Sequence, residues 1–208
     1  MGVQNENNVE GSKFESAMNG YSGDTTKHLP TSEWEKMSAM ARGELINDNK
    51  PTNRPSKDDF YLNTALAYLQ RSTCLRRKYA AVIINNDVIV AAGYNGSPRG
   101  IANCCDTGKC YRKEHNIPAG EQYEACVSVH AEQNAIINAG RERCIGATLY
   151  LTGIETDSNE YTEADCCVLC KRAIKNAGIE KVIFRTKTGG VRKVNVSDWG
   201  YDDLTIKR

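Results

Sequence analysis

Two short segments constrain the fold of this chain most, because their side chains suit one metal ion and therefore have to meet in space. They are residues 130–132 (His-Ala-Glu) and residues 167–170 (Cys-Val-Leu-Cys). One imidazole and two thiolates form a ligand set that suits zinc. Three protein ligands leave one position of a tetrahedral zinc open to water, which distinguishes a catalytic site from a structural one. Glu132 suits an acid/base better than a further ligand.

Both segments are predicted to begin helices. The apolar pattern after Val129 predicts a helix that ends at Gly140, and residues 167–177 form a second predicted helix that ends at Gly178. Because Cys167 and Cys170 are three residues apart, their thiols face the same way in the first turn. The N-terminus of a helix favours thiolates and other negative groups. The sequence therefore predicts a metal site between two helix N-termini.

The pattern around these segments alternates helices with strands. Ser56 and Asp59 have capping-box spacing, which predicts a helix from there to about Ser72. Four strands are predicted, the first two joined by a tight turn at Asn86-Asp87; they cover residues 79–85, 88–94, 147–152 and 181–185. This order implies an α/β fold in which helices sandwich a central mixed sheet.

Three parts of the chain differ in character. Residues 1–55 are predicted as a polar N-terminal extension with one possible helix from Ser32, residues 56–186 as the folded domain, and residues 187–208 as a C-terminal extension. Within the domain, residues 153–165 are predicted as an acidic surface loop, and residues 101–126 as a long loop that needs something to order it.

Charge and cysteine usage indicate the class of protein. The chain has 27 Lys and Arg against 26 Asp and Glu, a formal charge of +1, which gives no reason to expect a nucleic-acid groove. No apolar run is long enough for a bilayer, and the N-terminus is too polar for a signal peptide. The nine cysteines include metal-like spacings and favour thiolate ligands over disulfides. We expect a cytoplasmic protein without membrane or nucleic-acid partners.

The motifs together resemble those of one family. The residues that carry the resemblance lie in the segments 71–77 (RSTCLRR), 93–96 (GYNG), 130–136 (HAEQNAI), 146–150 (GATLY), 167–170 and 177–179 (AGI). The signature H-x-E…P-C-x-x-C is that of zinc deaminases. Over roughly residues 57–186 the chain resembles the zinc-dependent cytidine/deoxycytidylate deaminase superfamily, most of all dCMP deaminases and the related bacterial late-competence proteins.

The resemblance implies a fold and a reaction. The expected fold is cytidine deaminase-like, a three-layer α/β/α sandwich around a central mixed five-stranded sheet. The expected reaction is hydrolytic conversion of dCMP to dUMP and ammonia, with Glu132 as the proton shuttle and with zinc on His130, Cys167 and Cys170. The chain has Cys166 where the family has proline, which leaves Cys166 or Cys167 as the ligand; the two-residue gap to Cys170 favours Cys167.

The remaining cysteines form a second candidate site. The resemblance implies a second, structural zinc on Cys74, Cys104, Cys110 and Cys126, which would order the loop 101–126. Cys105 or His115 can replace one of these ligands, and reduced free thiols are the alternative. Cys144 is predicted as an ordinary buried or surface thiol.

Substrate-binding residues are also implied by the resemblance. Asn95 is expected to contact the sugar or base of the nucleotide, although an ordinary turn residue fits the same position. Ala131, Arg71, Ser72 and Arg77 are further substrate-binding candidates. Arg76, Lys78 and Arg99 also have positions in the chain that suit contact with a 5′-phosphate. For Arg71, Arg77 and these three residues, the alternative is an ordinary solvated charge on the surface.

The resemblance also implies a homo-oligomer and a response to dCTP and dTTP together with Mg²⁺, because family members are usually homo-oligomers, often hexamers, and many respond to these nucleotides.

Two alternative functions remain open. One is deamination of another cytosine or adenine nucleoside, nucleotide or tRNA. The other is a non-catalytic zinc-binding assembly protein, for which replacing Glu132 changes only fold stability.

Overall fold

A five-stranded mixed sheet forms the centre of the computed structural model, which describes residues 54–118 and 120–205. The strand order is β2-β1-β3-β4-β5. Strands β1 (Arg77–Asn85), β2 (Val88–Tyr94) and β3 (Thr148–Glu155) pair antiparallel. Strand β4 (Lys181–Arg185) is parallel to β3 and antiparallel to β5 (Val191–Asn195). The predicted mixed five-stranded sheet is confirmed.

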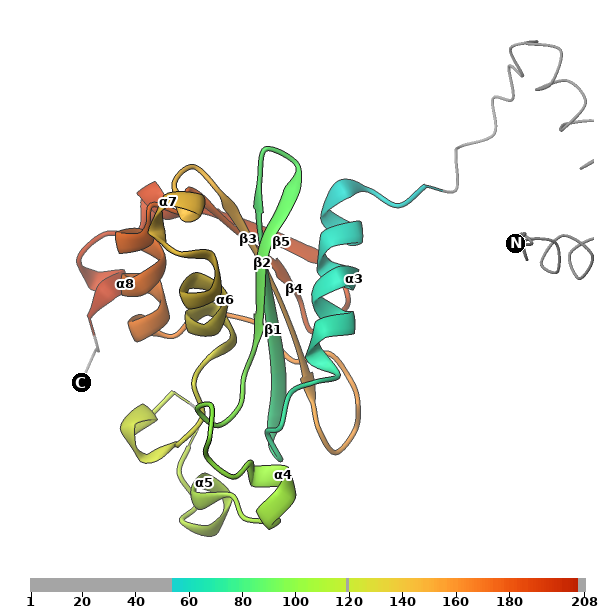
Figure 1. Cartoon of the computed structure of the whole chain (residues 1–208), viewed down its shortest axis with the longest axis vertical. Helices are drawn as coiled ribbons and strands as arrows, with labels where there is room; N and C mark the ends of the chain where they lie inside the picture. Colours follow the sequence, from blue (N-terminus) through green and yellow to red (C-terminus); the bar gives the residue numbers. More distant parts are fainter. Residues whose placement is uncertain (1–53, 119, 206–208) are drawn as a thin grey trace, which may run out of the picture. The chain divides into compact units, whose positions relative to one another are not determined.

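Helices cover both faces of the sheet (Figure 1). Helix α3 (Lys57–Leu69) packs on one face, where its residues Tyr61, Leu62 and Ala65 form a buried cluster with side chains of β1, β3 and β4. Helices α6 (Ala131–Ala139), α7 (Arg141–Cys144) and α8 (Val168–Ala177) cover the other face and share the larger buried cluster with the sheet. The predicted α/β/α sandwich is therefore confirmed.

Local sequence signals explain the first elements. The Ser56 hydroxyl accepts a hydrogen bond from the Asp59 amide at 3.1 Å, as the capping-box spacing predicts. The hairpin between β1 and β2 turns at Asn86 and Asp87, whose φ angles are 49° and 65°. Two successive residues with positive φ are the mark of a type I′ turn, whose twist matches that of the flanking strands.

A close approach brings α6 onto the sheet. A Cβ atom added at Gly93 of β2 would lie 2.6 Å from the Ala131 carbonyl oxygen and 2.8 Å from the Asn134 carbonyl carbon. No side chain fits there, so glycine is needed for α6 to pack this closely. Since α6 begins directly after His130, this contact also sets the position of the predicted metal ligand.

The acidic segment differs from its prediction as a loop. Residues Gly153–Glu155 extend β3, because they pair with Arg77–Tyr79 of β1 and because the chain turns back so that Ile154 bridges to Tyr161. Ile154, Thr162 and Ala164 are buried. The prediction of a surface loop over the whole of residues 153–165 was wrong in this part.

The long segment 101–126 contains short helices, α4 (Cys104–Thr107), α5 (Tyr111–Glu114) and η2 (Tyr123–Ala125). At the C-terminus, β5 is followed by η3 (Val196–Asp198) and η4 (Asp202–Leu204). Residues 187–208, predicted as an extension, thus supply the edge strand of the sheet. Trp199 is buried there, as expected of a docked element, whereas Tyr201 is 83% exposed.

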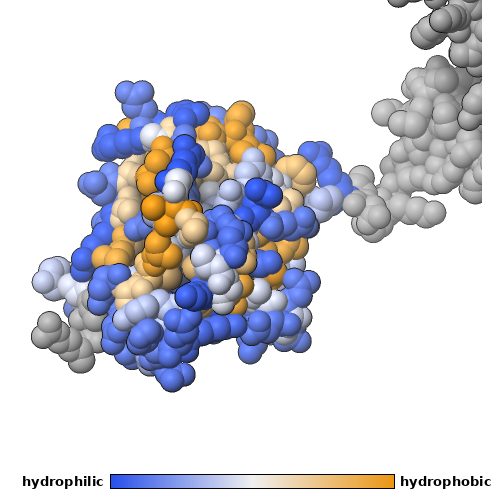
Figure 2. All heavy atoms as spheres, turned by 60° about the horizontal axis from the view of Figure 1, so that its bottom comes forward, coloured by the Kyte–Doolittle hydropathy of each residue, from blue (hydrophilic) through white to orange (hydrophobic). Residues whose placement is uncertain are grey.

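The face seen in Figure 2 is largely hydrophilic at its rim and carries a band of exposed hydrophobic residues between the polar regions. Within the described ranges, no helix has the length and apolar character needed to cross a bilayer. The predicted helix from Ser32 and the rest of residues 1–53 lie outside the described residues.

Candidate active site

The two segments of the predicted metal site meet in the structure. His130 Nδ1 lies 3.5 Å from Cys167 Sγ and 3.3 Å from Cys170 Sγ. His130 is the N-cap of α6 and Cys167 is the N-cap of α8, where its sulfur accepts a hydrogen bond from the Cys170 amide. The two helix N-termini therefore place one nitrogen and two sulfurs together.

Backbone pairing fixes the start of α6. Val129 and Gly96 form an isolated β-bridge, with N–H···O distances of 2.8 and 3.2 Å in the two directions. This bridge ties the residue before His130 to the loop that follows β2. The Asn134 side chain adds a hydrogen bond to the Tyr94 carbonyl oxygen at 2.8 Å. The sheet thus determines where the imidazole lies.

The three groups fit a zinc ion. Their ligand atoms all lie within 4.8 Å of one another, and they are the one such group of three or more His, Cys, Asp or Glu side chains among the described residues. Zinc bond lengths of about 2.3 Å to sulfur and about 2.0–2.1 Å to nitrogen put tetrahedral ligand atoms roughly 3.5–3.8 Å apart. The observed nitrogen–sulfur distances are close to that spacing. Cys167, not the buried Cys166, belongs to the group.

Hydrogen bonding within the site favours the thiolate form of Cys167. Hydrogen bonds from Cys170 and His130 lower the pKa of the Cys167 thiol to about 4, although burial opposes this. The hydrogen bond to Cys167 raises the pKa of His130, again against burial. Negative charge on sulfur is what a zinc ligand requires.

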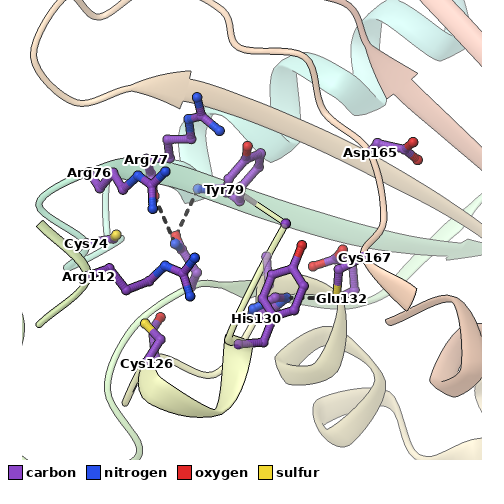
Figure 3. A pocket seen from close by; sticks show the side chains of 15 residues that line it. Cys74, Arg76, Arg77, Tyr79, Arg112, Cys126, His130, Glu132, Asp165 and Cys167 are labelled. Atoms are coloured by element: carbon purple, nitrogen blue, oxygen red, sulfur yellow. Dashed lines mark hydrogen bonds between the residues drawn. The ribbon is translucent and has the colours of Figure 1, made fainter. Parts of the chain in front are cut away.

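Glu132 lies in the first turn of α6 and is 4% exposed. Burial is the main cause that raises the pKa of its carboxyl group, and the nearby His130 opposes the shift. Figure 3 shows the Glu132 side chain directed toward Cys167, on the same side of the cavity as the metal group. A general acid/base works best when its pKa is close to the operating pH, so an upward shift from the ordinary carboxyl value suits Glu132 to that role.

These residues open onto a cavity of about 160 Å³. Of the predicted site residues, the cavity is lined by Arg77, Asn95, Ala131 and the second-cluster cysteines Cys74 and Cys126, in addition to His130, Glu132 and Cys167. Its wall also includes Tyr79, Arg112 and Tyr123, for which no motif predicted a functional role. The Tyr123 ring lies edge-on to His130, with 5.3 Å between ring centroids.

Asn95 is buried at the wall of this cavity and supports the end of β1. Its amide oxygen accepts hydrogen bonds from the Tyr79 amide at 2.8 Å and the Ser72 hydroxyl at 2.6 Å, and its amide nitrogen donates to the Arg77 carbonyl oxygen at 2.9 Å (Figure 3). Ser72 therefore reaches the cavity only through Asn95. A contact between Asn95 and a nucleotide stays a prediction.

Arg71 lies elsewhere. It lines a second cavity of about 400 Å³ together with Arg99 and the loop that follows β2. Its position between α3 and β1 does not reveal which cavity it lines, since the next residue, Ser72, donates a hydrogen bond to Asn95 while Arg71 lines the second cavity.

The second group of cysteines is less closely gathered. Burial raises the pKa of Cys104, and the nearby thiols of Cys74, Cys110, Cys126 and Cys105 add to the shift. They do not form a group of ligand atoms within 4.8 Å in the described residues. His115 stacks on Tyr111 and contacts its carbonyl oxygen, and Cys105 is exposed. Cys144 is fully buried, which agrees with the first of the two possibilities predicted for it, a buried or a surface thiol.

Comparison with known proteins gives a family and relatives. Residues 55–186 match the family model described as the cytidine and deoxycytidylate deaminase zinc-binding region. The chain is 33% identical over 153 residues to a deoxycytidylate deaminase of Schizosaccharomyces pombe, a match that covers 74% of this chain and 42% of that protein. It is 36% identical over 136 residues to the deoxycytidylate deaminase of Mycobacterium phage D29, covering 64% of this chain and 96% of the relative.

Among solved structures, the chain is similar to the dCMP deaminase of cyanophage S-TIM5 in complex with dCMP and dUMP. The TM-score is 0.44 at 28% identity, over 64% of this chain and 82% of that one. The match to the Schizosaccharomyces pombe protein spans less than half of that relative.

Proposed function

Because the chain belongs to the family of the cytidine and deoxycytidylate deaminase zinc-binding region, we propose that it is a zinc-dependent dCMP deaminase, which converts dCMP and water to dUMP and ammonia. The observation that supports this most is the buried Glu132 carboxyl group, which lines one cavity together with His130 and Cys167, while the sulfur of the buried Cys170 lies within 4.8 Å of the other two ligand atoms. A structural zinc site has no use for such a carboxyl group.

His130, Cys167 and Cys170 are the residues that would hold the zinc ion. When bound at a three-ligand site, zinc lowers the pKa of water, which provides a nucleophile near neutral pH. The helix N-termini at His130 and Cys167 favour the negative charge of the two sulfurs.

Glu132 moves the protons. The attacking water forms a bond to C4 of the pyrimidine and gives a proton to the carboxylate. Glu132 delivers this proton to ring atom N3. The hydroxyl group now on C4 then gives up its remaining proton, which Glu132 passes to the exocyclic amine, so that the bond from C4 to the amine breaks, ammonia leaves and a carbonyl group forms at C4. Burial raises the pKa of this carboxyl group, which brings it closer to the pKa that suits a group that both accepts and releases a proton.

The rest of the cavity suits the nucleotide. The backbone of Ala131 and the side chains of Asn95 and Arg77 line it, so we assign them to substrate binding, with Ser72 holding Asn95 in orientation. Tyr123 supplies an aromatic face close to His130.

We further propose regulation by dCTP and dTTP, with Mg²⁺ on their phosphates, at the second cavity. It is separate in its lining from the zinc cavity, contains Arg71 and Arg99, and includes the buried hydroxyls of Thr73 and Ser97, which lack a hydrogen-bond partner in the described structure. Turnover of dCMP measured with each nucleotide and Mg²⁺ tests this. No effect of either nucleotide on the rate would contradict it.

We propose that the chain forms a homo-oligomer, and a hexamer is one of the assemblies that this proposal includes. Large hydrophobic side chains are exposed on the adjacent elements β2 and α6, with Val88 60%, Ile89 44% and Ile137 71% exposed. Light scattering after gel filtration gives the number of subunits, and a monomer at all concentrations would refute the proposal.

The cysteines support two more proposals. All nine lie in described parts of the chain as free thiols, which suits a reducing cytoplasm. Cys74, Cys104, Cys110 and Cys126 would hold a second, structural zinc, since four thiolates close a tetrahedral site. A zinc content of one per chain, unchanged by Cys104→Ser, would rule the second metal out.

A substrate screen tests the proposed reaction against its rivals. The purified protein is incubated with dCMP, dCTP, cytidine, adenosine and an unmodified tRNA, and ammonia release is followed. We expect release from dCMP. Release from another substrate alone identifies a different deaminase, and no release from any of them supports a non-catalytic zinc protein.

A further inference from the structure

Arg112 is a buried cation at the wall of the zinc cavity. It belongs to the short helix α5 and is 8% exposed. Within residues 54–118 and 120–205, no carboxylate lies within ion-pair distance of its guanidinium group. A buried charge is costly unless an opposite charge or several hydrogen bonds compensate it.

Neutral groups hold the guanidinium in place. One terminal nitrogen donates to the Gln122 carbonyl oxygen at 2.7 Å, and the other donates to the Pro118 carbonyl oxygen at 2.5 Å. The guanidinium carbon lies 5.8 Å from the centre of the Tyr123 ring. A guanidinium has five N–H donors, so these contacts orient it and leave donors for a further partner.

The other cations of the cavity are compensated or more exposed. Arg77 forms an ion pair with Glu155 at 2.7 Å, and its side chain is 36% exposed. Arg76 donates to the Ile117 carbonyl oxygen at 3.3 Å and is half-buried. Of the three arginines that line the cavity, Arg112 is therefore the one with a buried and unpaired charge.

The position of Arg112 suits one end of a nucleotide. Figure 3 shows it beside Cys74, Arg76 and Cys126, whereas Glu132 and Cys167 lie at the opposite side of the group of residues. A pyrimidine whose C4 atom faces Glu132 has its sugar and 5′-phosphate directed away from the metal ligands. The unpaired positive charge of Arg112 thus lies on the side of the cavity where the anionic phosphate of the substrate is expected.

We propose that Arg112 binds the 5′-phosphate of the substrate and thereby makes the site select a nucleotide over a nucleoside. The inference deepens the proposed function and rests on it. The phosphate would supply the charge that the cavity lacks, through the bidentate contact that a guanidinium makes with phosphate oxygens. The two carbonyl contacts keep the guanidinium at the correct angle.

The test compares dUMP with deoxyuridine, which differ only in the phosphate. Calorimetry measures the affinity of the zinc-loaded wild-type protein and of Arg112→Gln for each ligand. We expect Arg112→Gln to weaken dUMP binding by about 10- to 100-fold and to leave deoxyuridine binding unchanged within about twofold, as loss of one charge-assisted contact predicts. An equal loss for both ligands would mean that Arg112 only orders the loop, and unchanged dUMP binding would also overturn the proposal.

Arg143→Gln is the matched control. Arg143 also donates to backbone carbonyl oxygens, those of Ala139, Asn138 and Val90, but it lines neither of the two cavities considered above. We expect this variant to keep the wild-type preference for dUMP over deoxyuridine. A similar loss of preference in Arg143→Gln would show that the effect is not specific to Arg112.

Two further measurements keep the outcomes distinct. If circular dichroism shows that Arg112→Gln does not fold, Arg112→Lys replaces it, and the loss of the planar fork is expected to reduce the dUMP preference at least several-fold. An unchanged preference in that variant overturns the proposal. A wild-type protein that binds dUMP tightly but does not deaminate dCMP would refute the proposed reaction while leaving the role of Arg112 intact.

Discussion

Replacement of Gly93 by alanine tests how the sheet positions the metal ligand. The new Cβ atom would lie 2.6 Å from the Ala131 carbonyl oxygen, about 0.8 Å short of the 3.4 Å at which ordinary contact begins. The three nearest atoms, from Ala131, Asn134 and Ala135, are all backbone atoms of α6, so the helix itself has to move. Metal sites tolerate changes of only about 0.2 Å in ligand distance. We therefore expect the displacement to disturb His130.

The expected loss of stability is about 1–3 kcal/mol, as for other overpacked positions, or about 2–4 °C of melting temperature for each kcal/mol in a unit of this size. Urea unfolding measures the stability, and competition with a chromophoric chelator measures zinc affinity. Gly200→Ala is the control, since its Cβ would meet nothing closer than Asp203 Oδ2 at 3.9 Å. If Gly93→Ala matches wild type in both measurements, α6 does not depend on this close contact.

Two more changes give direct readouts. Hydrogen bonds from Arg185 and Ser56 lower the pKa of Asp59. The ion pair between Asp59 and Arg185 therefore stabilises the fold at pH values above 3.8, the ordinary pKa of the carboxyl group. This stabilisation is lost as the pH falls through the lower pKa that Asp59 has in the folded protein. Asp59→Asn should thus melt earlier than wild type at pH 7 and converge with it toward pH 2; a constant difference would argue against the pair. Cys170→Ser should reduce zinc affinity by more than the roughly 10- to 100-fold typical of lost outer-shell partners, whereas Cys105→Ser should not. Equal zinc binding by both would exclude Cys170 as a ligand.

Local signals allowed much of the fold to be predicted. The side-chain cap at Ser56, the turn at Asn86-Asp87 and the glycine stop at Gly178 all depend on neighbouring residues, and the structure has each of them. The metal group was predictable for a different reason. The chemistry of His130, Cys167 and Cys170 requires that they meet, whatever the chain does between them.

Long-range contacts decided the rest. The segment Val191–Asn195 has no alternating apolar pattern, and it becomes the edge strand β5 only because β4 offers a free edge. Residues Gly153–Glu155 continue β3 because the ends of β1 and Tyr161 pair with them. Arg112 and Tyr123 lie in a segment without periodicity. Only the folded chain therefore shows that both line the same cavity as His130, with the Tyr123 ring packed against the imidazole.

The role of Glu132 as the proton carrier of a zinc deaminase is tested most directly by one measurement on Glu132→Gln. Zinc content and ammonia release from dCMP are determined on the same samples of the variant and of wild type. We predict wild-type zinc content together with a turnover rate lower by about 10²- to 10⁴-fold, the usual contribution of a general acid/base. Turnover close to that of wild type, with zinc retained, would contradict the assignment of Glu132.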